Sequence, residues 1–170
     1  MILLGLGSNL SSRYGDRFKN IDIALSTIEK HEIRVIKKSS YFESFSYPNK
    51  KDPKFINVVV QVESLILPEK LASILLSVEE SLDRKRNKKN DPRTCDIDIL
   101  DFNGQILNFK YNDFEFVVPH KKLIYRNFVL FPLNEIAPKW IHPETKDSIN
   151  SLIEKLSTED KKSILKIKKP

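Results

Sequence analysis

The order in which apolar residues change their spacing limits what this chain can fold into. Short apolar runs and alternating segments predict strands near 2–6, 33–46, 54–64 and 95–102. A spacing near 3.6 residues predicts two helices between them, near 16–30 and 68–86. The resulting order is strand, helix, strand, strand, helix, strand, which is typical of a split βαβ arrangement. We therefore predict an α+β fold in which helices cover one face of a mainly antiparallel sheet.

Local signals refine these elements. Asp16 is placed to cap the first helix, and Pro68 suits the first turn of the second. Asn103-Gly104 predicts a hairpin turn after the fourth strand. A last helix is expected near 147–157.

Length and charge indicate the general class of protein. The 170 residues suit one domain, which we expect over 1–160, followed by a basic tail, 161–170, expected to be a solvated, frayed end. The net charge of +6 can favour nucleic acid, an anionic membrane surface or phosphorylated small molecules. No apolar run is long enough for a membrane helix, and no signal peptide is visible. Cys95 is the single cysteine, so we expect a cytoplasmic protein without an intramolecular disulfide.

The most informative segment is Asp91-Pro92-Arg93-Thr94-Cys95-Asp96-Ile97-Asp98-Ile99. Side chains alternate across a strand, so Asp96 and Asp98 point to the same face. Two adjacent carboxylates suit Mg²⁺, which takes one or two carboxylates and completes its shell with water and phosphate oxygens. The alternative is an exposed acidic pair on an edge strand. Arg93 and the basic run before it favour the metal reading, because a polyphosphate needs both metal and arginine.

Glycine-rich nucleotide motifs offer little support for another phosphate site. The run Gly5-Leu6-Gly7-Ser8-Asn9-Leu10 lacks the third glycine of a dinucleotide fingerprint, and no Walker motif is present. We expect Gly5 and Gly7 to serve mainly in a tight turn from strand to loop. A nucleotide would then be held by side chains and ordinary backbone.

A second segment, 54–62, has two unequal faces. Its aliphatic residues alternate on one face, and Phe55 and Asn57 share the other. An aromatic ring beside an amide can stack on a flat heterocycle and read its edge. A core phenylalanine and a capping asparagine are the alternative, and this segment alone does not decide between them. His120, Arg126 and Phe128 follow later as weaker candidates for phosphate contact and stacking.

Taken together, these motifs resemble the 6-hydroxymethyl-7,8-dihydropterin pyrophosphokinase family. The resemblance spans roughly residues 2–145. It is carried by segments that occur in the order of the family: Gly5-Leu6-Gly7-Ser8-Asn9-Leu10, Ser39-Ser40-Tyr41-Phe42-Glu43-Ser44, Phe55-Ile56-Asn57-Val58-Val59-Val60, Asp91-Pro92-Arg93-Thr94-Cys95-Asp96-Ile97-Asp98-Ile99, Val118-Pro119-His120, Arg126-Asn127-Phe128-Val129-Leu130-Phe131-Pro132-Leu133 and Glu135-Ile136-Ala137-Pro138.

The resemblance implies a ferredoxin-like α+β core and transfer of pyrophosphate from ATP to 6-hydroxymethyl-7,8-dihydropterin, releasing AMP, in folate biosynthesis. Asp96 and Asp98 would hold two Mg²⁺ ions. By the same resemblance, the catalytic residues would be Arg84, Arg93, Asp96 and Asp98. The pterin would be bound by Ser44, Tyr47, Phe55, Asn57 and Phe128. The ATP co-substrate would be bound by Glu79, Arg86, Arg93, Ile99, His120 and Arg126.

This sequence departs from the family pattern at several positions. Phe45 and Ser46 stand where many members have two prolines. Asn90 and Asp91 replace a Trp-Gly pair found in some members, and Leu76 replaces a glutamine. These changes concern nucleotide affinity and loop closure.

Two other functions remain open at this point. The first is another Mg²⁺-dependent nucleotidyl-, phosphoryl- or glycosyltransferase that uses the Asp96/Asp98 pair, although such an enzyme would not need Phe55 with Asn57. The second is a nucleic-acid binder that uses the basic loop and tail. We expect neither nucleic acid nor membrane as a partner, because no RNP-like run of aromatic residues accompanies the basic segments.

Overall fold

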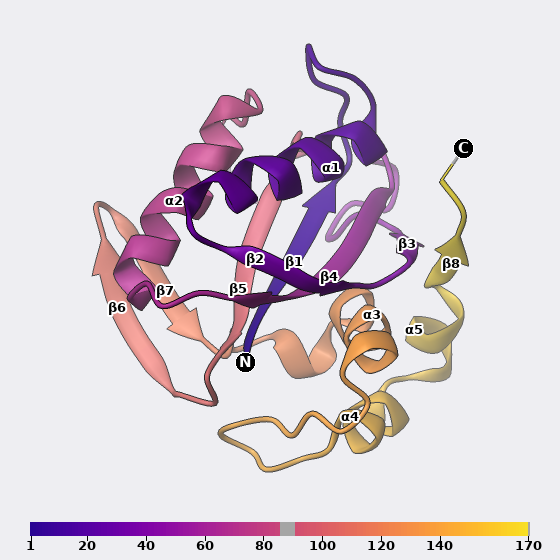
Figure 1. Ribbon diagram of the computed structural model, residues 1–170. Helices are drawn as coiled ribbons and strands as arrows, with labels where there is room; N and C mark the ends of the chain where they lie inside the picture. The colour runs from indigo at the N-terminus through magenta and orange to yellow at the C-terminus, as the bar shows by residue number, and fades with distance from the viewer. Residues whose placement is uncertain (86–90, 170) are drawn as a thin grey trace.

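The computed structural model describes residues 1–85 and 91–169 (Figure 1). Within these residues, six strands form one sheet in which every pairing is antiparallel. The strands are β1 (Ile2–Ser8), β2 (Arg34–Lys38), β3 (Tyr41–Ser44), β4 (Phe55–Glu63), β5 (Asp96–Phe102) and β8 (Leu165–Ile167). Their order is β5-β1-β4-β3-β8, with β2 also pairing with β4. The predicted α+β class and split βαβ order are confirmed.

The predicted strand 33–46 is two strands that share one partner. β2 pairs with the second half of β4, and β3 pairs with the first half. Between them, Ser39 keeps contact with the sheet: its backbone nitrogen donates to the Val59 carbonyl at 2.9 Å, and its Oγ accepts from the Val59 nitrogen at 3.0 Å. The serine side chain thus replaces one backbone partner where the strand is interrupted.

Two helices cover one face of the sheet (Figure 1): α1 (Arg17–Ile28) and α2 (Pro68–Ser81). Asp16 caps α1, as predicted, by accepting from the Lys19 nitrogen at 2.8 Å. A 3₁₀ turn, η1 (Glu29–His31), follows α1. α2 ends five residues before the predicted position, and Asp83 beyond it has a positive φ of 63° that a helix cannot continue through. The buried stripe of α2 packs on Leu4, Leu6 and Ile97 of the sheet.

The opposite face is covered at one end by α3 (Asn127–Ile136) and α4 (Ile149–Lys155). These helices bury a second apolar cluster against Leu3, Val59 and Leu100. Helices therefore lie on both faces, whereas the sequence pattern predicted one. The part of the second face that α3 and α4 leave uncovered carries the polar residues of β1, β4 and β5.

A separate hairpin, β6 (Leu107–Tyr111) and β7 (Phe114–Val118), packs beside α2. Asn103 and Gly104 do turn the chain, with φ values of 55° and 70°, but β6 pairs with β7 and not with β5. The predicted hairpin at Asn103-Gly104 is therefore wrong, and the hairpin turn lies at Asn112-Asp113. A 3₁₀ turn, η2 (Leu123–Tyr125), leads into α3.

The C-terminal residues are ordered in a way the sequence did not indicate. α5 (Thr158–Lys162) is followed by β8, which adds to the edge of the sheet beside β3 (Figure 1). The expectation of a frayed end is wrong for these residues. Within the described ranges, no helix combines the length and the apolar character needed to cross a membrane.

Candidate active site

Three residues on neighbouring strands form one row across the uncovered face of the sheet. Gly7 of β1 pairs with Asn57 of β4 on one side and with Asp96 of β5 on the other. Asp98 lies two residues further along β5, opposite Gly5. The period of two therefore places an amide and two carboxylates on the same surface, as predicted.

Gly5 and Gly7 form the floor between these side chains. Both lie inside β1, so the expected turn from strand to loop is wrong. A Cβ atom on Gly7 would stand 3.4 Å from the Phe55 ring and 3.5 Å from Oδ1 of Asn57. The missing side chains keep the surface between Asn57 and the carboxylates open.

Two cavities meet at the carboxylates. The larger, of about 530 Å³, is lined by Phe55, Asn57 and Phe128 among others. The smaller, of about 170 Å³, lies between β5, the end of α2 and β7. Among the described residues, Asp96 and Asp98 are the two that line both cavities. The two carboxylates therefore lie where the cavities adjoin.

Two arginines neutralise Asp96. Arg84 Nη1 lies 2.6 Å from its Oδ1, and Arg93 Nη2 lies 2.9 Å from its Oδ2. Burial alone would raise the pKa of Asp96, but these guanidinium groups hold the pKa below its ordinary value. Within the described residues, the buried Nε atom of Arg93 has no hydrogen-bond partner.

Asp98 differs from Asp96 in charge balance. Its only ion pair in the described part of the chain is with Arg126, whose Nη1 lies 3.0 Å from Oδ2. Burial raises the pKa of Asp98, and the negative charge of Asp96 raises it further. Arg126 also lies 3.3 Å from Nε2 of His120, and burial together with Arg126 lowers the pKa of that imidazole. The two carboxylates thus share one surface but pair with different arginines.

Three of the six predicted nucleotide residues line the smaller cavity. Glu79, Ile99 and His120 line it, together with Arg84. The buried Glu79 carboxylate contacts Arg84 and accepts from the Ile97 nitrogen at 2.7 Å, so it also anchors β5. Arg93 and Arg126 line the larger cavity, and Arg86 lies outside the described residues.

The predicted pterin residues line the larger cavity. Asn57 Nδ2 donates to the Phe42 carbonyl at 3.2 Å and to Ser44 Oγ at 3.0 Å, which fixes the plane of its amide. Phe55 lies under the Arg93 guanidinium, 5.0 Å from ring to Cζ. Phe128 lies under that of Arg126 at 5.6 Å. Tyr47 stands at the rim and is largely exposed.

Sequence reasoning gave no role to several residues that shape this cavity. Asn9 is buried, and it holds the Arg93 loop by accepting from the Arg93 nitrogen at 2.7 Å. Its Nδ2 donates to the Pro53 carbonyl at 3.0 Å. Asn127 and Ser163 also line the larger cavity. Asn9 lies within one of the motifs that carried the family resemblance, and nothing else in the sequence pointed to a role for it. Ser163 gave none.

The donor set fits Mg²⁺ better than a metal held entirely by protein. No group of three or more His, Cys, Asp or Glu side chains able to hold a metal ion is found among the residues the structure describes. Asp96 and Asp98 supply two carboxylates beside cationic side chains, and Mg²⁺ bound in this way keeps positions for phosphate oxygens. The residues present therefore fit Mg²⁺ bound together with a polyphosphate.

Behind the carboxylates lies Cys95, the single cysteine of the chain, which is completely buried. Burial raises the pKa of its thiol well above the ordinary value. Its carbonyl accepts from Arg84 Nη1 at 3.0 Å. The thiol is therefore part of the core under the site.

Comparison with known proteins supports the resemblance seen in the sequence. Residues 3–138 match the family described as 7,8-dihydro-6-hydroxymethylpterin-pyrophosphokinase. The 2-amino-4-hydroxy-6-hydroxymethyldihydropteridine pyrophosphokinase of Aquifex aeolicus is 34% identical over 84% of this chain and 83% of its own length. The folic acid synthesis protein fol1 of Pneumocystis carinii is 34% identical over 96% of this chain.

Several relatives are much longer than this chain. The chain spans 21% of the Pneumocystis protein and 22% of the folic acid synthesis protein FOL1 of Dictyostelium discoideum. Among solved structures, Plasmodium falciparum HPPK-DHPS superposes with a TM-score of 0.72 and 16% identity, over 91% of this chain and 42% of that one. This structural likeness shows the shared fold.

Proposed function

The chain belongs to the 7,8-dihydro-6-hydroxymethylpterin-pyrophosphokinase family, and on that premise we propose that it transfers pyrophosphate from ATP to 6-hydroxymethyl-7,8-dihydropterin, releasing AMP, in folate biosynthesis. One observation carries the proposal beyond family membership. The two cavities that would hold the two substrates have only Asp96 and Asp98 in common among the described residues.

The larger cavity suits the pterin. Phe55 and Phe128 offer aromatic faces for a flat ring, and Oδ1 of Asn57 offers an acceptor, since both Nδ2 hydrogens of this amide are already donated within the protein. Because Asn57 is already bonded to Ser44 and the Phe42 carbonyl, its orientation is set before the ligand binds. Tyr47 would cover the open side of the ring.

The smaller cavity suits part of the nucleotide, with its phosphates directed toward the carboxylates. Asp96 and Asp98 would hold Mg²⁺, for which we propose two ions. The metal supplies charge neutralisation and alignment of the phosphates. Arg84 and Arg93, which neutralise Asp96 in this structure, are placed to turn to phosphate oxygens once Asp96 binds a cation.

In this reaction the protein mainly aligns the two substrates and need not form a covalent bond to them. The pterin hydroxymethyl oxygen would attack the β-phosphorus of ATP, and the bond to the α-phosphate would break as AMP leaves. Arg93 contacts Asp96 and Arg126 contacts Asp98, so both can neutralise the charge that develops there. We name no strong general base.

The place of action is a further part of the proposal. The buried, unpaired Cys95 suits a reducing compartment, so we place the activity in the cytoplasm. The expected partners are the two small substrates, with neither nucleic acid nor membrane.

Incubation with Mg-ATP and 6-hydroxymethyl-7,8-dihydropterin tests the function, with nucleotide products resolved by ³¹P NMR. AMP that forms only when the pterin is present is expected, and its formation should stop with EDTA and resume with excess Mg²⁺. Asp96→Asn and Asp98→Asn should abolish it, whereas Asp113→Asn, an exposed change in the β6–β7 turn, should not. Formation of ADP instead would indicate another phosphoryl transfer, and turnover by Asp98→Asn in Mg²⁺ would refute the metal assignment.

A further inference from the structure

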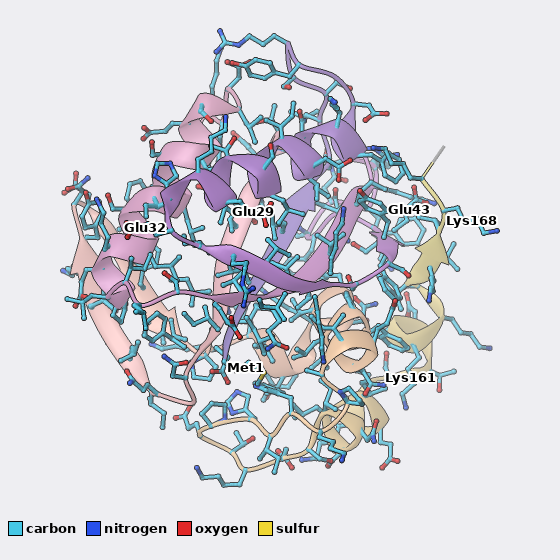
Figure 2. The ribbon with its side chains drawn as sticks, viewed as in Figure 1. Met1, Glu29, Glu32, Glu43, Lys161 and Lys168 are labelled. Carbon is cyan, nitrogen blue, oxygen red and sulfur yellow. The ribbon has the colours of Figure 1, made fainter. Side chains whose placement is uncertain are left out.

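Residues 157–167, which we term the C-terminal strap, connect two walls of the larger cavity. The strap places Asp160 and Ser163 in the cavity lining. Its β8 pairs with β3, the strand that ends at Ser44 in the same lining. In Figure 1 the strap lies along the edge of the sheet beside β3 and α3, and Figure 2 shows Lys161 and Lys168 on the same side of the molecule as Glu43 of β3.

The strap also reaches the loop between β3 and β4, where Tyr47 stands. Lys50 Nζ lies 2.8 Å from Glu159 Oε1, but both side chains are largely exposed. An exposed ion pair of this kind contributes little to stability. Besides the pairing of β8 with β3, a buried anchor holds the strap against α3.

That anchor is Asn127, the first residue of α3, which is only 8% exposed. Its Nδ2 donates to the Asp160 carbonyl at 2.6 Å and to Ser163 Oγ at 2.9 Å. The two bonds hold the strap where α3 begins.

Asn127 stands between two residues of the site. Arg126 before it pairs with Asp98, and Phe128 after it lines the larger cavity. A change in how the strap sits against Asn127 therefore acts directly beside the aromatic wall of the cavity.

We propose that Asn127 is a positioning residue that holds the C-terminal strap in place as a wall of the pterin cavity. The inference rests on the proposed function and extends it to residues beyond 138, where the family match ends. The strap contributes Asp160 and Ser163 to the larger cavity, and none of its residues to the smaller one. Its position should therefore affect pterin binding more than ATP binding.

The strap has internal bonds that do not depend on Asn127. The Asp160 carbonyl also accepts from the Ser163 nitrogen at 3.3 Å and from Ser163 Oγ at 3.0 Å. Loss of the Asn127 donors thus releases the strap from α3 without breaking its own turn. The effect of such a change on binding can be separated from an effect on folding.

Asn127→Asp tests this, because aspartate has the same shape but cannot donate to the Asp160 carbonyl. We expect the KM for pterin to rise about tenfold while the KM for ATP stays within about twofold. Ser163→Ala, which removes one of the two acceptors, should raise the pterin KM by about threefold. Asn150→Asp, the same substitution at an exposed site on α4, is the matched control.

Hydrogen exchange gives an independent readout. Amides of the strap should exchange faster in Asn127→Asp than in the wild type, while those of β1 stay unchanged. If Asn127→Asp fails to fold, Ser163→Ala carries the kinetic test. If the wild type is active and the pterin KM of both variants equals that of the wild type, the inference is overturned. The same holds if only Ser163→Ala folds and its pterin KM equals that of the wild type.

An inactive wild type would count against the proposed function and not against the strap. The strap is then tested by exchange with 6-hydroxymethyl-7,8-dihydropterin added as the probe. Added protection of residues 157–167 in the wild type that is lost in Asn127→Asp supports the wall. No added protection overturns it.

Discussion

Oδ1 of Asn9 lies 2.7 Å from the backbone nitrogen of Arg93, across 84 residues of sequence. The same side chain donates to the Pro53 carbonyl, so one buried amide holds both the arginine loop and the loop that follows β3. Asn9→Ala leaves buried polar groups without partners, and we expect it to lower the free energy of unfolding by about 3 kcal/mol. Urea denaturation measures this loss.

The same substitution should also raise the KM for pterin, because both loops border the larger cavity. Asn108→Ala, at an exposed position of β6, serves as the control and should change neither quantity. An Asn9→Ala protein as stable as the wild type would show that the two loops hold their positions without this amide.

Gly7→Ala should affect binding and not folding. Its Cβ would meet Phe55 and Asn57 at 3.4 Å and 3.5 Å, which is ordinary contact, but it would stand on the cavity floor. One added methyl group in a fitted site changes binding by about 1–3 kcal/mol, so the pterin KM should rise at least about fivefold. Steady-state kinetics at saturating ATP measures it.

The opposite result is expected at Gly104. There φ is 70° and no atom lies within 4 Å of an added Cβ, so Gly104→Ala should cost about 1 kcal/mol of stability through backbone strain and leave kinetics unchanged.

If Gly7→Ala bound pterin normally, the ring would not lie over Gly7.

Arg93→Ala should slow turnover more than it weakens nucleotide binding. In the described residues its Nε is buried without a partner beside Asp96, which suits a group that meets phosphate during the reaction. We expect kcat to fall about 100-fold while the KM for ATP changes less than about threefold. Lys85→Ala, an exposed change in the same basic segment, is the control, and equal losses in kcat and ATP affinity would contradict a role in the transition state.

Asp22 should make stability depend on pH under acidic conditions. Burial alone would raise its pKa, but hydrogen bonds from Lys169, Tyr41 and Lys38 lower the pKa from 3.8 to about 2. Because the folded-state pKa is depressed, the stabilisation is complete above about pH 4 and is lost as the pH falls toward 2.

The difference in unfolding free energy between wild type and Asp22→Asn should therefore shrink as the pH falls from 5 to about 2. Urea denaturation at several pH values measures it. A difference that does not change with pH would mean that Asp22 is not charged in these pairs.

The sequence could predict which face of the sheet carries the candidate site, because side chains alternate along a strand. Alternation placed Asp96 with Asp98 and Phe55 with Asn57, and the structure brings both pairs to one surface. The alternation of side chains along each strand does not predict which strands are neighbours in the sheet. The row of Asn57, Gly7 and Asp96 depends on β1 lying between β4 and β5, and that follows from the tertiary fold.

Other features depend on contacts that have no local signal. The Asn103-Gly104 turn formed, but β6 pairs with β7 across the next turn, at Asn112-Asp113, and not with β5. The lysine-rich end of the chain was expected to fray because the last residues of a domain are often poorly ordered. β8 is ordered instead by pairing with β3, and Asn127 holds α5 through one carbonyl and one hydroxyl oxygen.

The burial of Cys95 has a practical consequence. With a single thiol in the chain, any modification by a thiol reagent must occur at one known atom directly behind Asp96. Because the thiol is completely buried in the main apolar cluster, the reagent can reach it only when the core beside the start of β5 opens. The rate of thiol labelling thus measures how often the core beside the carboxylates opens. A substrate that lowers this rate stabilises the closed state of that part of the sheet.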